Sequence, residues 1–142
     1  MTTASQIMHQ GVECIDENDT LQTAATRMRD LHVGALPICG DDNRLHGIIT
    51  DRDIVVHCLA DGKDPRGAHA ADLADGPPVW VDADADIGDV LSTMESHAIR
   101  RLPVIRDRQL VGIISEADLA THLGQHQVAE FTHEVYAAPP ND

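Results

Sequence analysis

The chain has 142 residues and a formal net charge of −14, with 10 Lys and Arg against 24 Asp and Glu. Hydrophobic residues make up 42% of the sequence, a normal fraction for a globular protein, which excludes wholesale disorder. An acidic surface repels nucleic acid and anionic lipid, which bind through clustered Lys and Arg. No apolar run is long enough to span a bilayer, and the N-terminus does not read as a secretory signal. We therefore expect a cytoplasmic protein, or one exported without a signal peptide, with no nucleic-acid partner and no membrane insertion.

The predicted elements follow the same order in both halves of the chain. The first half is expected to form a short strand, a helix, a hairpin of two strands and a second helix, at 12–15, Leu21–Leu31, Ala35–Cys39, Leu45–Thr50 and 51–59. The second half is expected to repeat these five elements at 79–81, Ile87–His97, 102–105, 110–115 and 116–123. Asp19 and Asp86 are the expected N-caps of the longer helices, with Gln22 and Asp89 three positions on.

An internal repeat underlies this order. The segment that ends in Leu36-Pro37-Ile38 aligns with the one that ends in Leu102-Pro103-Val104 at an offset of 66 residues, and the strands after them align at 65. We expect repeat 1 at residues 8–60, a linker and lead-in helix at 61–73, repeat 2 at 74–123 and a C-terminal tail at 124–142. A unit this short is marginal alone. We therefore predict an α+β fold in which tandem β-α-β-β-α repeats share one core across a pseudo-two-fold axis.

The doubled order, with Leu-Pro-Ile or Leu-Pro-Val before each hairpin and Gly-Ile-Ile-Thr/Ser-x-x-Asp after it, resembles the CBS-domain pair, or Bateman module. The resemblance covers roughly residues 8–123. It implies a non-enzymatic sensor that holds adenine nucleotides in clefts between the repeats, often as a homodimer. For a stand-alone pair it implies a regulatory role, such as in a hypoxia or stress response.

The resemblance also implies ligand positions. It assigns a glycine, a hydroxyl residue and an aspartate in each repeat to nucleotide binding: Gly47, Thr50 and Asp53, and Gly112, Ser115 and Asp118. The hydroxyl residues precede helices, so unpaired backbone N–H groups there are expected to face a phosphate. The same spacing also matches a capping box, in which hydroxyl and carboxylate satisfy the helix terminus. Both roles stay open.

Positive charge distinguishes the two repeats. Arg100 and Arg101 precede a predicted strand of repeat 2, where members of the resembled family often carry a basic residue that faces the phosphate, whereas repeat 1 has Gly34 and Ala35 there. Surface ion pairs with Asp residues are the alternative role for these arginines. The acidic chain favours a monophosphate such as AMP over ATP.

Histidines and cysteines offer a second chemistry. His122 and His126 stand four residues apart near the end of the last predicted helix, a spacing that can hold zinc, although exposed histidines are the alternative. Cys14 and Cys39 each stand at the end of a predicted strand. A β-α-β crossover can make these two strands parallel neighbours, so the cysteines form either a disulfide or two buried thiols. A disulfide would favour an oxidising or exported setting. Cys58 is expected to be a packing residue.

No catalytic constellation, P-loop or dinucleotide fingerprint occurs in the sequence, so no enzyme is predicted and no cofactor is required. In the tail, Val128, Phe131 and Val135 recur at helical spacing and are expected to pack on the body or on a partner. The alternatives to a nucleotide sensor are a structural or interaction protein with empty clefts, and a stress protein stabilised by zinc or a disulfide.

Overall fold

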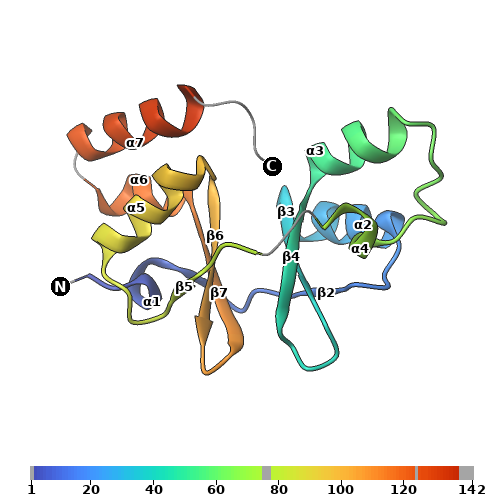
Figure 1. The fold of residues 1–142 in the computed structure, drawn as a ribbon, viewed down its shortest axis with the longest axis horizontal. Coiled ribbons are helices and arrows are strands. Elements are labelled where there is room, and N and C mark those ends of the chain that lie inside the picture. The colour runs from blue at the N-terminus through green and yellow to red at the C-terminus, as the bar shows by residue number, and fades with distance from the viewer. Residues whose placement is uncertain (1, 75–77, 124, 138–142) are drawn as a thin grey trace. The chain divides into compact units, whose positions relative to one another are not determined.

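The computed structural model describes residues 2–74, 78–123 and 125–137. It divides into two compact units, shown in Figure 1: unit 2 runs from Glu13 to Pro78, and unit 1 combines the segment up to Val12 with the chain from Val79 onward. Helices are combined with sheets whose longer strand pairs are antiparallel, so the predicted α+β fold class is confirmed. In the described part of the chain, no helix is long and apolar enough to cross a membrane.

Unit 2 contains a three-stranded sheet in the order β2-β3-β4. Its elements are β2 (Ile15–Asp16), α2 (Leu21–Leu31), β3 (Ala35–Cys39), β4 (Leu45–Thr50), α3 (Asp51–Ile54), η1 (Val55–Leu59) and α4 (Ala70–Leu73). β2 runs parallel to β3, and β4 returns antiparallel as a hairpin. The core consists of aliphatic side chains such as Leu21, Ile38 and Ile49, all fully buried, because the chain offers almost no aromatic residues to fill it.

Unit 1 contains a four-stranded sheet in the order β1-β7-β6-β5. Its elements are α1 (Ala4–Ile7), β1 (His9–Gln10), β5 (Val81–Asp82), α5 (Ile87–His97), β6 (Arg101–Arg106), β7 (Gln109–Ser115), α6 (Glu116–His122) and α7 (Gln125–Ala137). Helices α5 and α6 contact β6 and β7, and α7 contacts α5 (Figure 1). Phe131 and Val135 of α7 are buried in this core, which confirms that these two apolar positions of the tail pack on the body of the protein, whereas the side chain of Val128 lies outside the described residues.

The compact units and the sequence repeats differ at the start of the chain. The segment before repeat 1 belongs to unit 1, where the N–H groups of Ala4 and Ser5 donate to the carbonyls of Ala85 and Ala83 at 2.8 and 2.9 Å. The segment before repeat 2 makes the equivalent bonds in unit 2. There Ala70 and Ala71 donate to Asp19 and Glu17, at 2.8 and 2.9 Å. Each repeat thus gives its lead-in segment to the unit of the other.

Two local expectations were wrong. The first strand of each repeat is only two residues long and begins later than expected, because pairing starts where the chain meets β3 or β6, at Ile15 opposite Ile38 and Val81 opposite Val104. The N-cap of α2 is Thr20, whose hydroxyl accepts the N–H of Thr23, and not Asp19, which accepts the N–H of Asp16 instead. Asp86 caps α5 as expected, accepting the N–H of Gly88.

Candidate functional site

The first candidate position lies in unit 2, where β4 ends and α3 begins. The Thr50 N–H donates to Asp53 Oδ2 at 3.0 Å, and the Asp53 N–H donates to Thr50 Oγ1 at 3.1 Å. These reciprocal bonds form a capping box, which confirms the structural role weighed from the sequence. Thr50 and Asp53 are only 4% and 9% exposed, so both are committed to the interior of their own unit.

The equivalent position in unit 1 has the same box but is more open. Ser115 N–H and Oγ donate to Asp118 Oδ2 at 2.8 and 3.0 Å, and the Asp118 N–H donates to Ser115 Oγ at 3.3 Å. The Asp118 side chain is 20% exposed, and its other oxygen, Oδ1, lies 3.8 Å from Nδ1 of His9. His9 lies beside Asp118 because the segment up to Val12 belongs to unit 1, where β1 pairs with β7. Asp118 therefore keeps one carboxylate oxygen that the box does not use.

The expectation of unpaired backbone N–H groups at these helix starts was wrong for five residues. The Arg52 N–H donates to Asp51 Oδ1 at 2.8 Å. Asp51 donates to the carbonyl of Gly34 at 2.9 Å, and Glu116 to that of Arg100 at 3.1 Å. The N–H groups of Asp53 and Asp118 are bonded within the capping boxes. In each unit the residue just before the neighbouring strand, β3 or β6, accepts the first donor of the helix, so side-chain charge has to supply most of any attraction for a phosphate.

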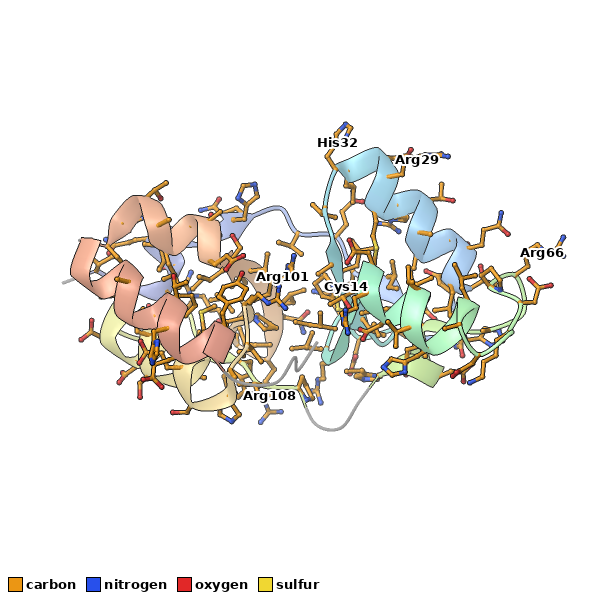
Figure 2. The ribbon with its side chains drawn as sticks, turned by 90° about the horizontal axis from the view of Figure 1, so that it is seen from above. Cys14, Arg29, His32, Arg66, Arg101 and Arg108 are labelled. Atoms are coloured by element: carbon orange, nitrogen blue, oxygen red, sulfur yellow. A yellow bond between two sulfur atoms is a disulfide. The ribbon has the colours of Figure 1, made fainter. Side chains whose placement is uncertain are left out.

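Arg101 provides such a charge in unit 1. It pairs with Ser115 in the register of β6 and β7, so the two side chains stand beside each other on one face of the sheet. Arg101 is half-buried, and its side chain appears among those of unit 1 in Figure 2. In unit 2 the equivalent pair is Ala35 opposite Thr50, so a methyl group replaces the guanidinium. The two candidate positions are therefore chemically unequal.

Arg100 is engaged by the last helix. Its guanidinium carbon lies 4.9 Å from the centroid of the Tyr136 ring, and the Tyr136 hydroxyl donates to the carboxylate of Glu116. The hydrogen bond to Glu116 raises the pKa of Tyr136, aided by partial burial, while Arg100 acts in the opposite direction. Tyr136 and Glu116 were not predicted as site residues, because their contact depends on where α7 packs.

The two motif glycines make room for the lead-in segments. A Cβ at Gly112 would lie 2.4 Å from Sδ of Met8 and 2.8 Å from the carbonyl oxygen of His9, and a Cβ at Gly47 would lie 3.2 Å from that of Ala74. Met8 and Ala74 are themselves 66 positions apart, as the exchanged segments are. Close approach of backbone is thus required at both glycines by the protein itself, whereas their part in ligand binding stays a prediction.

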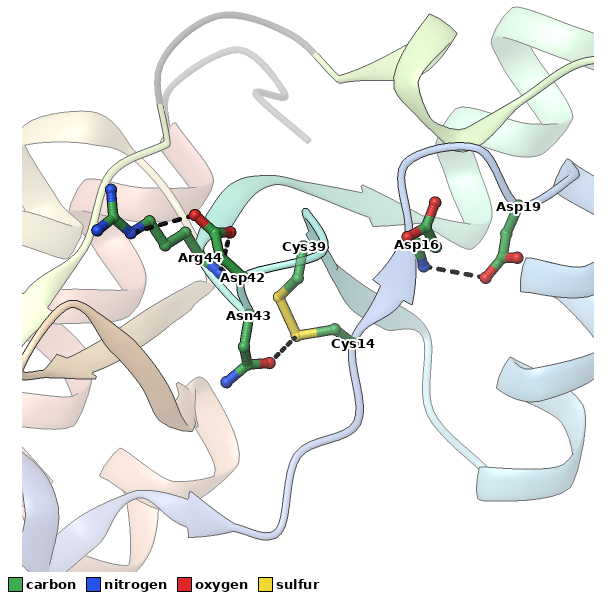
Figure 3. The surroundings of a disulfide bond; sticks show 7 residues. All are labelled: Cys14, Asp16, Asp19, Cys39, Asp42, Asn43 and Arg44. Atoms are coloured by element: carbon green, nitrogen blue, oxygen red, sulfur yellow. Dashed lines mark hydrogen bonds and ion pairs between the residues drawn. A yellow bond between two sulfur atoms is a disulfide. The ribbon is translucent and has the colours of Figure 1, made fainter.

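The structure contains a disulfide between Cys14 and Cys39, with Cα atoms 5.6 Å apart (Figure 3). Cys14 directly precedes β2, and Cys39 ends the parallel neighbour β3, so the crossover brings them together. Asn43 of the adjoining hairpin loop has its Oδ1 3.7 Å from Cys14 Sγ. Cys58 is fully buried in the core of unit 2, as expected of a packing residue.

The two candidate zinc ligands lie on different helices. α6 ends at His122, Leu123 has extended backbone, and α7 begins at Gln125, so the expectation that one helix carries both was wrong. The Nδ1 atom of His122 lies 2.8 Å from the carbonyl of Asp118, and the side chain of His126 is outside the described residues. Among the residues the structure describes, no three His, Cys, Asp or Glu side chains gather as a metal site.

A duplicated β-α-β-β-α order and paired Thr/Ser-x-x-Asp boxes define a tandem module of two like repeats. The family model of the CBS domain matches residues 4–59 and 70–125, so the chain belongs to the CBS-domain family. It is 52% identical over 135 residues to hypoxic response protein 1 of Mycobacterium tuberculosis, covering 95% of this chain and 94% of that protein. It is also 36% identical to the uncharacterized protein YlbB of Bacillus subtilis, over 84% of this chain and 81% of that protein.

Solved structures agree with this assignment. A crystal structure of hypoxic response protein I with two coordinated zinc ions matches with a TM-score of 0.80 and 54% identity, over 87% of this chain and all of that one. A CBS-domain protein of Thermoplasma acidophilum matches with a TM-score of 0.81 at 21% identity, over 94% of this chain and 75% of that one, and supports the fold alone.

Proposed function

We propose that this protein is a non-enzymatic regulatory module that binds an adenine nucleotide, AMP or a close analogue, at the start of α6 in repeat 2. The observation that carries the proposal is Arg101 opposite Ser115, a guanidinium beside a hydroxyl at the motif position of the family. Arg101 attracts the phosphate, and the Asp118 oxygen outside the capping box accepts from the ribose diol.

Repeat 1 is the weaker site. Ala35 replaces the arginine, and the Asp53 carboxylate is buried and bonded to the Thr50 N–H. The net charge of −14 opposes polyphosphates more than a monophosphate, so AMP should bind more tightly than ATP. Bound ligand then favours whichever conformation of the module it prefers, by the difference in its affinity for the alternatives.

Isothermal titration with AMP and ATP tests this function. Arg101→Gln should weaken AMP binding about tenfold or more, equivalent to about 1.4 kcal/mol or more. Arg108→Gln removes the same charge from an exposed hairpin turn of the same unit and should have little effect. No heat and no thermal shift at millimolar AMP would refute the proposal and leave an interaction protein with empty clefts.

A role in a hypoxia or stress response is part of the proposal. It is supported by the 52% identity to hypoxic response protein 1, whose name records such a response. The match covers 95% of this chain and 94% of the Mycobacterium relative. Induction of the transcript on oxygen depletion is the corresponding test, and unchanged transcript levels would contradict it.

Zinc binding is a second candidate, favoured by the two coordinated zinc ions in the structure of hypoxic response protein I. His122 and His126 are the ligands predicted from the sequence. Elemental analysis of untagged protein after zinc exposure should find bound metal, which His122→Ala reduces and His57→Ala, a change at an exposed histidine of unit 2, does not. Metal content near zero would exclude the site.

We also propose that the protein forms a homodimer. Unit 2 exposes apolar side chains on and after α2 and along η1, namely Leu31, Val33, Val55 and Leu59. A CBS-CP12 protein of cyanobacteria that is 30% identical is hexameric, which supports self-association in this family. Light scattering should give twice the chain mass, and Leu59→Asp should shift it to the monomer. A monomeric wild-type protein would contradict the proposal.

A further inference from the structure

Helix α7 is fixed to unit 1 by its apolar side. Phe131 and Val135 are 3% and 4% exposed and belong to the same core as Val90 and Met94 of α5. Tyr136 directly follows Val135 in α7, so the packing of Phe131 and Val135 in the core determines where the phenol lies. The ring itself is half-exposed, at 49%, which shows that it is not simply part of the core.

The phenol lies on the two residues that flank the proposed phosphate position. Arg100 precedes Arg101, and Glu116 follows Ser115. The Tyr136 ring stacks on the guanidinium of Arg100, and its hydroxyl donates to the Glu116 carboxylate. The N–H of Glu116 donates to the carbonyl of Arg100, which ties the start of β6 to the start of α6. One aromatic side chain therefore contacts the sequence neighbours of both Arg101 and Ser115.

The contact with Tyr136 affects two charged groups next to the site, the guanidinium of Arg100 and the carboxylate of Glu116. A cation stacked on an aromatic face is partly satisfied there and is less available to an incoming anion. The Glu116 carboxylate, which accepts a hydrogen bond from the phenol, is held beside the position where a second anion would bind, and like charges oppose each other. Both effects lower the affinity of the site for phosphate while α7 is docked as the structure shows.

We propose that Tyr136 makes α7 an autoinhibitory element of the repeat 2 site, competing with the phosphate of AMP for Arg100, so that ligand binding displaces the phenol. This inference rests on the proposed nucleotide-binding function. Repeat 1 lacks an equivalent of this contact. Gly34 occupies the position that corresponds to Arg100, and a loop rather than a long helix follows η1. The regulation is therefore a property of one repeat only.

Titration of variants with AMP tests the proposal. Tyr136→Ala should lower the Kd for AMP three- to tenfold. Tyr136→Phe keeps the ring over Arg100 and loses the bond to Glu116, so its Kd should lie between those of Tyr136→Ala and the wild type. Thr132→Ala, at an exposed position of the same helix, should leave the Kd unchanged.

A spectroscopic readout accompanies the affinities. Tyr136 is the only tyrosine of the chain, so the absorbance of tyrosinate near 295 nm follows this side chain alone. Saturating AMP should move its ionisation to lower pH, because the phenol leaves Glu116. Equal affinity of Tyr136→Ala and wild type for AMP, or a phenol titration unaltered by AMP, would overturn the autoinhibition and leave the proposed function intact. Absence of AMP binding to every variant would overturn both.

Discussion

Replacing Gly112 with alanine tests why the family motif carries glycine here. The added Cβ would meet Sδ and Cγ of Met8 at 2.4 and 2.8 Å and the carbonyl oxygen of His9 at 2.8 Å. The Met8 side chain can rotate away, but the His9 oxygen is part of β1, whose Gln10 pairs with Gly112 itself. The whole lead-in segment must therefore move to accommodate one methyl group.

The expected cost follows from this geometry. Overpacking of this kind costs about 1–3 kcal/mol, and the backbone contact places Gly112→Ala in the upper half of the range. At about 4 °C of melting temperature per kcal/mol for a chain of this size, the midpoint should fall by about 8–12 °C. Gly47→Ala meets only Ala74, at 3.2 Å, so its midpoint should fall less.

Calorimetry or circular dichroism of three alanine variants is the assay. Gly88→Ala is the matched control in unit 1, because it lies in α5 on an exposed surface, with Asp86 Oδ2 as the nearest atom at 3.8 Å. There alanine should be neutral or stabilising by about 0.5–1 kcal/mol through helix propensity. A Gly112→Ala variant as stable as Gly88→Ala would refute the packing explanation, and loss of AMP binding without loss of stability would instead assign the glycine to the ligand.

Loss of the two capping boxes should lower the free energy of unfolding by unequal amounts, measured by denaturant unfolding. Asp53→Ala leaves the buried Thr50 N–H without its acceptor and should cost about 1–3 kcal/mol. Asp118→Ala removes a more exposed carboxylate and should cost less. An equal cost would show that burial does not distinguish the repeats. The disulfide spans 25 residues and should stabilise the chain by about 3 kcal/mol. A reducing agent should therefore lower the stability of the wild type but not of Cys14→Ser, and an unaffected wild type would show reduced thiols. The raised pKa of Tyr136 means that the folded chain keeps the phenolic proton longer than the unfolded chain, so its contribution to stability is complete below the ordinary tyrosine pKa and is lost as pH rises through the folded value. Glu116→Gln should lower this pKa in an absorbance titration, and an unchanged titration would contradict the hydrogen bond.

The elements that the repeat supports twice were predictable from the sequence. α2, α5, β3 and β4 have the expected bounds, because their apolar spacing and turn residues are local signals that appear in both halves. The two-residue strands β2 and β5 were misplaced, since their limits depend on where a distant strand offers partners. Local patterns determine helices and hairpins, whereas the ends of short strands depend on tertiary contacts.

At the candidate site, too, the local motifs were predictable and the tertiary contacts were not. The Thr50 and Ser115 boxes follow from four-residue patterns and form as expected. His9 beside Asp118 could not be anticipated, because it requires β1 to pair with β7, about a hundred residues later in the chain. A faint signal existed upstream of the repeat, where Ala4 and Ile7 align with Ala70 and Leu73 at the offset of 66.

Duplication has produced two boxes with the same hydrogen bonds and different surroundings, and this difference predicts the stoichiometry of binding. Arg101 and an Asp118 side chain that is 20% exposed stand at one box, whereas Ala35 and a buried Asp53 stand at the other. If guanidinium charge determines affinity, calorimetry should find one tight AMP site per chain, and Ala35→Arg should strengthen the weaker site of repeat 1. If the shared Thr/Ser-x-x-Asp motif were sufficient, the wild type would already bind two equivalents with similar affinity. Two equivalents would therefore refute the role given to Arg101 while preserving nucleotide binding itself.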